Sequence, residues 1–63
     1  MIEKYKNLIG KNVVVAIPGR KIEGYWSDWL REEPSKESIL IDTEDSSIIE
    51  IFKDEILSIK LAN

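Results

Sequence analysis

Hydrophobic residues follow two different spacings along this chain. Near its start, four of them lie three or four positions apart: Ile2, Tyr5, Leu8 and Ile9. This spacing predicts a short amphipathic helix over residues 2–9, which Gly10 would end. A segment of this length does not form a stable helix alone. We therefore expect the helix to lie against a sheet and to cover an open end of it.

The rest of the chain contains segments rich in β-branched residues, several with alternating hydrophobic and polar positions. They predict five strands, which are separated by short turns and by one polar loop over residues 31–38. The predicted strands cover residues 12–17, 21–29, 38–43, 47–52 and 56–61. Gly24 lies in the middle of the second strand, which suggests a bulge or a sharp bend there.

These elements predict a mostly-β fold. Eleven of the 63 residues are isoleucine and three are valine, and both types pack well on a pleated surface. Consecutive short strands of this kind form an antiparallel meander. With the bend at Gly24, we expect a short N-terminal helix followed by a five-stranded, strongly bent antiparallel small barrel. The length allows one domain, residues 1–63.

The chain contains no cysteine and no histidine. This excludes disulfides, a zinc site built from these ligands and a nucleophile activated by histidine. The carboxylates of Asp42, Glu44 and Asp45 lack the spacing of a calcium loop. A barrel of this size also fills its interior with side chains and leaves no cleft. We therefore expect a protein that is not an enzyme, with no catalytic residues, no metal and no cofactor.

The net charge of −3 is unevenly distributed. Residues 1–27 carry five basic and two acidic side chains, whereas residues 28–55 carry ten acidic and three basic ones. Such an acidic surface repels phosphate and lacks the basic stripe of a nucleic-acid-binding protein. It could keep the protein in solution or dock on a basic partner. With no long apolar run and no signal-peptide pattern, we expect a cytoplasmic protein that does not contact a membrane.

Two segments resemble the Sm-like family of small SH3-like barrels. They are Leu8–Val15 (LIGKNVVV) and Gly19–Gly24 (GRKIEG). In that family a short helix precedes a Gly-Lys-x-Val-x-Val strand, and a Gly-Arg turn leads into a strand with a bending glycine. The closing segment Asp54–Ile59 is also similar to the end of such barrels. The resemblance covers most of the chain and implies a small barrel.

The segments with which Sm-like proteins read RNA are not matched here. The family has an Asp-x-apolar-Asn segment before the third strand, and this chain has Arg31 in the place of the asparagine. The family also has an Arg/Lys-Gly pair between the fourth and fifth strands, where this chain has Lys53–Glu55 (KDE) and no glycine. No RNA-binding residue is therefore carried over.

A second resemblance is to the Rof family, small acidic barrels that bind the Rho termination factor and inhibit it. The similar stretch is Gly24–Leu61, which includes an acidic loop and the segment Ile51–Ile59. The acidic balance of the chain is closer to this family than to the Sm-like one. This resemblance implies a protein partner.

Three aromatic residues cluster on the second predicted strand and its exit: Tyr25, Trp26 and Trp29. Strict alternation places Trp26 in the core with Ile22, and it places Tyr25 and Trp29 together on the opposite face. One interpretation is that all three cover the barrel mouth or the helix. The other is that the outward-facing pair binds a partner, because Tyr, Trp and Arg dominate interface energetics.

The second interpretation predicts a partner-binding surface of an aromatic pair, an arginine and the acidic loop after them: Tyr25, Trp29, Arg31, Glu32 and Glu33. The protein would then be a non-catalytic interaction module that acts by binding a basic protein partner. The alternative is an RNA-binding Sm-like homo-oligomer that uses basic residues of the first half: Lys4, Lys11, Arg20 and Lys21. Its subunits could associate through exposed strand edges, for example at residues 48–52.

Overall fold

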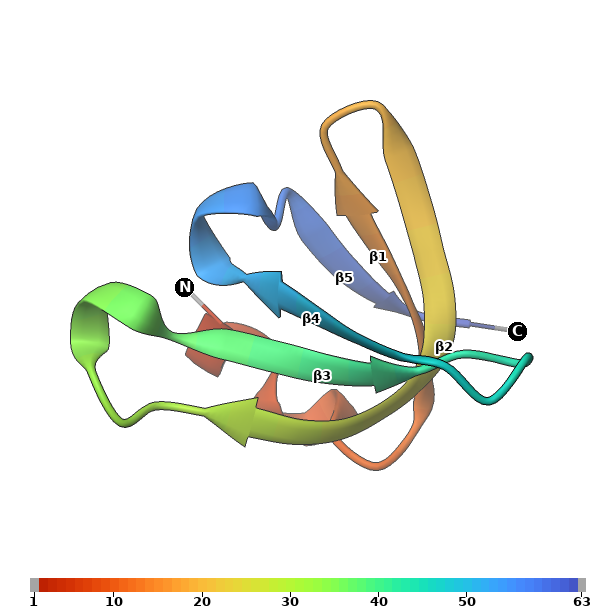
Figure 1. Ribbon diagram of the computed structural model, residues 1–63, viewed down its shortest axis with the longest axis horizontal. Coiled ribbons are helices and arrows are strands. Elements are labelled where there is room, and N and C mark those ends of the chain that lie inside the picture. Colours follow the sequence, from red (N-terminus) through yellow and green to blue (C-terminus); the bar gives the residue numbers. More distant parts are fainter. Residues whose placement is uncertain (1, 63) are drawn as a thin grey trace.

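The computed structural model describes residues 2–62, which form three short 3-10 helices and one five-stranded antiparallel sheet (Figure 1). The strands are β1 (Asn12–Ile17), β2 (Arg20–Leu30), β3 (Ser38–Asp42), β4 (Ile48–Phe52) and β5 (Ser58–Leu61). The helices are η1 (Ile2–Leu8), η2 (Pro34–Lys36) and η3 (Lys53–Glu55). The predicted mostly-β class, with a short helix ahead of five strands, is confirmed. None of these helices has the length and apolar character needed to cross a membrane.

The N-terminal helix η1 uses the predicted apolar stripe to pack on the sheet. Ile2 is fully buried, and the later apolar residues of the stripe are half-buried against the core. The helix is of the tighter 3-10 type, which is common in short pieces. Gly10 follows it with a φ of +86°, a conformation that glycine adopts without strain. The Gly10 amide donates a 2.8 Å hydrogen bond to the carbonyl of Trp26, which fixes the helix to β2.

The strand order in the sheet is β4-β3-β2-β1-β5. The first four strands form the predicted meander, but the fifth pairs with β1 and not with β4. The expectation that all five strands follow one another in the sheet was therefore wrong for β5. The reason is the path of the chain after η3, where the Leu57 amide donates a 2.8 Å hydrogen bond to the carbonyl of Ala16 in β1. Among residues 2–62, β4 and β5 are the two edges of the sheet.

β2 is long because it belongs to both halves of the sheet. Its first part, Arg20–Tyr25, pairs with β1, and its second part, Tyr25–Leu30, pairs with β3. Figure 1 shows β2 curving between these two partners, so that β1 and β5 lie on one side and β3 and β4 on the other. A Cβ atom at Gly24 would clash with the carbonyl oxygen of Asp42 and lie 2.7 Å from Cγ2 of Ile41. Glycine thus permits the close approach of β3 at the bend.

A bulge follows this bend. The β2–β3 register shifts between Trp26 and Asp28, so that Ser27 is the extra residue on β2. Before the bulge Tyr25 is opposite Asp42, and after it Trp29 is opposite Ile39, which is fully buried. The prediction that Tyr25 and Trp29 share a face was therefore wrong, because the extra residue reverses the alternation.

The core lies between the two halves of the bent sheet. Among the described residues it consists of Trp26 and nine aliphatic side chains, and Trp26 has no exposed surface, as predicted. Its indole N–H donates a 2.8 Å hydrogen bond to the carbonyl of Asp28, so the one polar atom of this side chain is satisfied. The remaining core members are Ile2, Val13, Val15, Ile22, Ile39, Ile41, Ile51, Ile56 and Ile59.

Replacing Gly24 by alanine should destabilise the protein by about 1–3 kcal/mol, because the new methyl group must displace the backbone of β3. Urea unfolding followed by circular dichroism would measure this loss. The control is Glu23→Ala at the exposed neighbouring position, which should change the free energy of unfolding by less than about 0.5 kcal/mol. Equal midpoints for the two variants would contradict the close approach at Gly24.

Candidate functional site

The five predicted site residues do not form one surface. Tyr25 is 44% exposed and lines a groove of about 590 Å³ with Asn12, Glu23 and Asp42, which we call the Tyr25 groove. Trp29 is on the opposite face of β2, and the last three members follow the end of that strand. The bulge at Ser27 thus separates Tyr25 from the rest of the predicted site.

Trp29 is held by three groups. Its side chain is half-buried and packs on the core, and its indole N–H donates a 2.9 Å hydrogen bond to Oε2 of Glu37. The guanidinium carbon of Arg31 lies 4.1 Å from the centre of the Trp29 ring, a cation–π contact. The exposed Arg31 therefore covers the aromatic surface that the sequence offered to a partner. Trp29 and Arg31 lie together as predicted, but they contact each other and do not form an open surface for a partner.

Glu37 connects Trp29 and Arg31 to the chain after β4, a role that no pattern in the sequence indicates. One oxygen accepts the Trp29 hydrogen bond, while Oε1 lies 3.8 Å from Nζ of Lys53. The backbone carbonyl of Glu37 also accepts a 2.9 Å hydrogen bond from the Lys53 amide. This ion pair is partly shielded from water, so it loses less to screening than the exposed pairs of the chain.

The acidic loop borders a second groove, on the face of β3 and β4 that points away from the core. Its volume is about 290 Å³, and we call it the Phe52 groove. The groove has two apolar side chains, three carboxylates and one amine: Leu30, Phe52, Glu32, Glu33, Glu50 and Lys36. Phe52 is 43% exposed, which is unusual for a large aromatic residue. The loop residues were predicted as site residues, whereas Phe52 and Glu50 were not.

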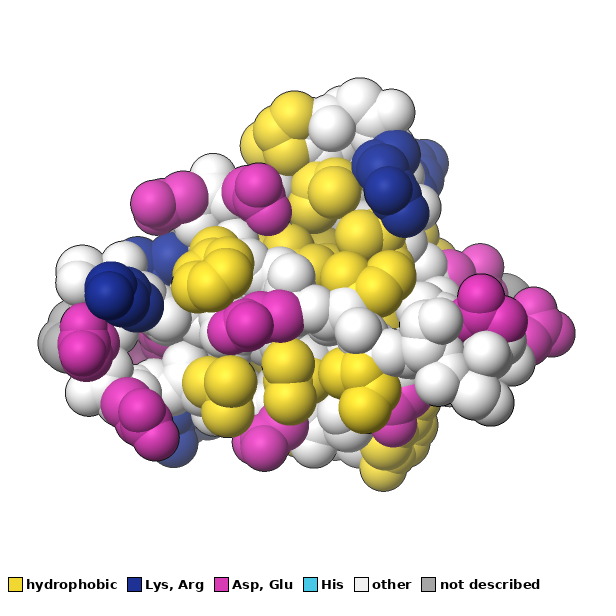
Figure 2. Space-filling view, in the orientation of Figure 1, with side chains coloured by type: hydrophobic (Ala, Val, Ile, Leu, Met, Phe, Trp, Pro, Cys, Tyr) yellow, Lys and Arg dark blue, Asp and Glu magenta, His cyan; other side chains and the backbone are white. Residues whose placement is uncertain are grey.

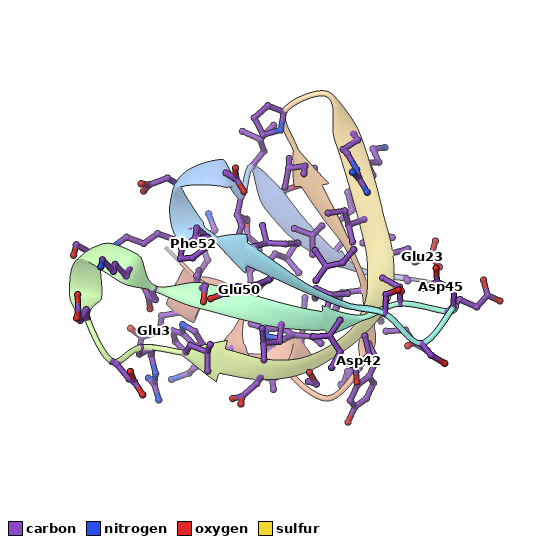
Figure 3. The ribbon with its side chains drawn as sticks, in the orientation of Figure 1. Glu3, Glu23, Asp42, Asp45, Glu50 and Phe52 are labelled. Atoms are coloured by element: carbon purple, nitrogen blue, oxygen red, sulfur yellow. The ribbon has the colours of Figure 1, made fainter. Side chains whose placement is uncertain are left out.

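Glu50 is fixed in position by β3. Its Oε2 accepts a 2.7 Å hydrogen bond from the hydroxyl of Ser38, whose side chain is fully buried. In Figure 3 the Glu50 side chain lies across the sheet beside Phe52, with both on β4. This hydrogen bond thus holds the carboxylate at the Phe52 groove.

A third groove, of about 440 Å³, lies between the start of β4 and the first half of β2. It is lined by Ile49, Arg20 and Glu23 together with the β3–β4 turn, and we call it the Ile49 groove. Hydrogen bonds within the turn lower the pKa of Asp45, and the largest contribution comes from the Thr43 hydroxyl. This carboxylate therefore stays charged to lower pH than an ordinary aspartate.

The described residues contain no group of three or more carboxylate, histidine or cysteine side chains arranged to hold a metal ion. All three grooves are open and carry several carboxylates. No protein-family model matches this chain, and neither the curated proteins nor the solved structures contain a match.

Because Trp29 packs on the core, Trp29→Ala should cost about 2–3 kcal/mol of stability and should not act only on binding. Trp29→Phe keeps an aromatic ring under Arg31 but loses the hydrogen bond to Glu37, and we expect a loss of about 1 kcal/mol. Thermal unfolding of the two variants would test this order. A Trp29→Ala variant as stable as the parent would show that the side chain is free for a partner.

The Asp45 carboxyl should titrate below its ordinary pKa of 3.8 in the folded protein. The folded pKa is lower than the unfolded one, which is the ordinary 3.8. The contribution of Asp45 to stability is therefore complete above the unfolded pKa and is lost as the pH falls through the folded pKa. Thr43→Val removes the strongest hydrogen-bond donor and should raise the pKa of Asp45 toward 3.8. NMR titration of the Asp45 side-chain carboxyl carbon in parent and variant measures both values. The same midpoint in parent and variant would rule out this hydrogen bond as the cause.

Proposed function

We propose that this chain is a non-catalytic protein-interaction module that binds a basic segment of a partner protein. The observation that carries the proposal is the Phe52 groove, where an exposed aromatic side chain lies among three carboxylates. An arginine or lysine side chain fits such a groove, because its apolar stem can cover Phe52 while its charge meets the carboxylates. Binding of this kind could regulate the partner by covering its basic surface.

The electrostatics of the groove support a cationic ligand. Lys36 is its only basic lining residue, and its amine lies 3.9 Å from Glu33 in an exposed ion pair. Glu32 and Glu50 have no such pairing with a cation among the ion pairs of the described chain. Figure 2 shows acidic side chains spread over this face of the molecule, with separate hydrophobic side chains between them in its lower part and a continuous hydrophobic patch above.

We also propose that the sheet is a small barrel of the Sm-like or Rof type. The short helix ahead of five antiparallel strands and the bend at Gly24 support this assignment. Of the two families, the Rof type agrees better with an acidic surface that binds a protein. The net charge of −3 supports the same choice.

An RNA-binding homo-oligomer is the second proposal, and the two unpaired sheet edges favour it as a route to assembly. The positions of the basic residues that it would use do not favour RNA binding. Lys11 precedes β1, whereas Arg20 and Lys21 follow the turn at its other end, so they do not form one stripe along the sheet. A nucleic acid needs a continuous basic path to release many counterions.

The test compares two probe peptides, Ac-(Arg-Gly)₄-NH₂ and Ac-(Glu-Gly)₄-NH₂, by NMR titration of the whole chain. We expect the basic peptide alone to bind, with the largest amide shifts at Phe52 and Glu33. Glu33→Gln should weaken binding about three- to tenfold, because the groove loses one of its three carboxylate charges. A fluorescent oligo-U probe should not bind at about 0.2 M salt if the first proposal holds.

Glu3→Gln is the matched control for Glu33→Gln. It removes the same charge and an ion pair of the same spacing, because Glu3 lies 3.7 Å from Lys6 in η1. Equal weakening by the two variants would mean that net charge alone attracts the peptide, and the groove assignment would fail. Salt-sensitive oligo-U binding by a ring-sized species in light scattering would favour the RNA-binding oligomer instead.

A further inference from the structure

The edge strand β4 exposes backbone hydrogen-bonding groups in a regular row. The Thr43 amide donates to the carbonyl of Ser47, and the Lys53 amide donates to the carbonyl of Glu37. Hydrogen-bonded pairs alternate along an antiparallel ladder, so Ile49 and Ile51 also bond toward β3. The N–H and C=O groups of the residues between them therefore point to the open edge: Ile48, Glu50 and Phe52.

The side chains of β4 do not protect this edge. Natural sheets guard their edges with lysine, proline or inward-pointing charges. β4 has no lysine or proline, and its one charged residue, Glu50, is bonded to Ser38 on β3. Ile48 is 68% exposed and Phe52 is 43% exposed, so the apolar side chains at both ends of the edge remain open to solvent. At the other edge of the sheet, β5 lies against η1.

The charges around β4 determine what kind of strand could pair with it. Two acidic residues precede β4 in the turn, two follow it in η3, and one lies at its centre: Glu44, Asp45, Asp54, Glu55 and Glu50. A second copy paired antiparallel about the centre of β4 would bring Glu50 opposite Glu50. It would also bring the acidic residues of the turn in one copy close to those of η3 in the other. Like charges at opposed positions destabilise strand pairing. Lys53, the basic residue of η3, is paired with Glu37, so a basic strand would meet mainly complementary charge along this edge.

We propose that the partner segment binds as an additional β-strand along the open edge of β4. This inference rests on the proposed function, because it specifies how the basic segment is held. Backbone hydrogen bonds to Ile48, Glu50 and Phe52 would provide the affinity. Basic side chains of the added strand lie on the outer face, beside Glu50 and the Phe52 groove. Its alternate side chains are apolar and lie beside Ile49, over the Ile49 groove.

The probe for this mode is the alternating peptide Ac-Lys-Val-Lys-Val-Lys-Val-Lys-NH₂. Two derivatives carry backbone N-methyl groups. One is methylated on the three valines, and the other on the last three of the four lysines. Each derivative loses three hydrogen-bond donors from one edge of the peptide and keeps its charge. We expect one derivative to lose at least about tenfold in affinity and the other to change less than about twofold, because only one edge faces β4.

The matched protein variants are Ile48→Pro and Ile48→Ala. Both remove the exposed isoleucine side chain, but only proline removes the N–H that points to the open edge, a position where proline is tolerated. We expect the Ile48→Pro variant to bind the unmethylated peptide at least about fivefold more weakly than the Ile48→Ala variant does. In the parent protein, the amide protons of Ile48, Glu50 and Phe52 should exchange rapidly when free and at least about tenfold more slowly with the peptide bound.

Three other results would contradict this inference. If both N-methylated derivatives bind as well as their parent, strand addition is overturned, while the acidic surface remains the binding site. If neither the alternating peptide nor Ac-(Arg-Gly)₄-NH₂ binds, the proposed function fails together with this inference. A dimer in light scattering that Ile48→Pro dissociates would assign the edge to a second copy of the chain and overturn the peptide as its occupant.

Discussion

The close approach between Gly24 and the end of β3 is the constraint on which the fold depends. β2 serves as partner to β1 and then to β3, and the change of partner occurs at Tyr25, directly after Gly24. The backbone of Asp42 occupies the space that a side chain at Gly24 would need. This contact lets the sheet bend over Trp26, and the small core can then exclude water from both sides. A chain without disulfide bonds depends on that core for its stability.

The position and order of the elements could be predicted because they depend on local pattern. The limits of β1 agree with the alternation in residues 12–17, and the N-terminal helix follows the spacing of its apolar side chains. The bulge at Ser27 has no such signature. Its hydroxyl donates to the carbonyl of Leu40 at 3.3 Å, a contact that exists only after β2 and β3 have paired. The pairing of β5 with β1 likewise depends on contacts between distant segments.

The same distinction applies to the candidate site. Glu32 and Glu33 could be selected from the sequence because charge and loop composition are local properties. The contributions of Glu50 and Phe52 arise from the β3–β4 register, which places Phe52 opposite Ser38 and brings both residues beside the acidic loop. Trp29 shows the opposite error. Its residue type suggested a binding surface, whereas its environment makes it a support for Arg31 and a hydrogen-bond donor to Glu37.

The pairing of β5 with β1 has a consequence for when this protein can fold. The Ala62 amide donates a 2.9 Å hydrogen bond to the carbonyl of Asn12, so one ladder joins positions fifty residues apart. During synthesis on the ribosome, β1 is made before its second neighbour β5. Until residue 62 emerges, one side of β1 is unpaired and Ile59 of β5 is missing from the interior. The nascent chain should therefore complete this sheet only after residue 62 has emerged, and until then it depends on its acidic residues to remain dispersed.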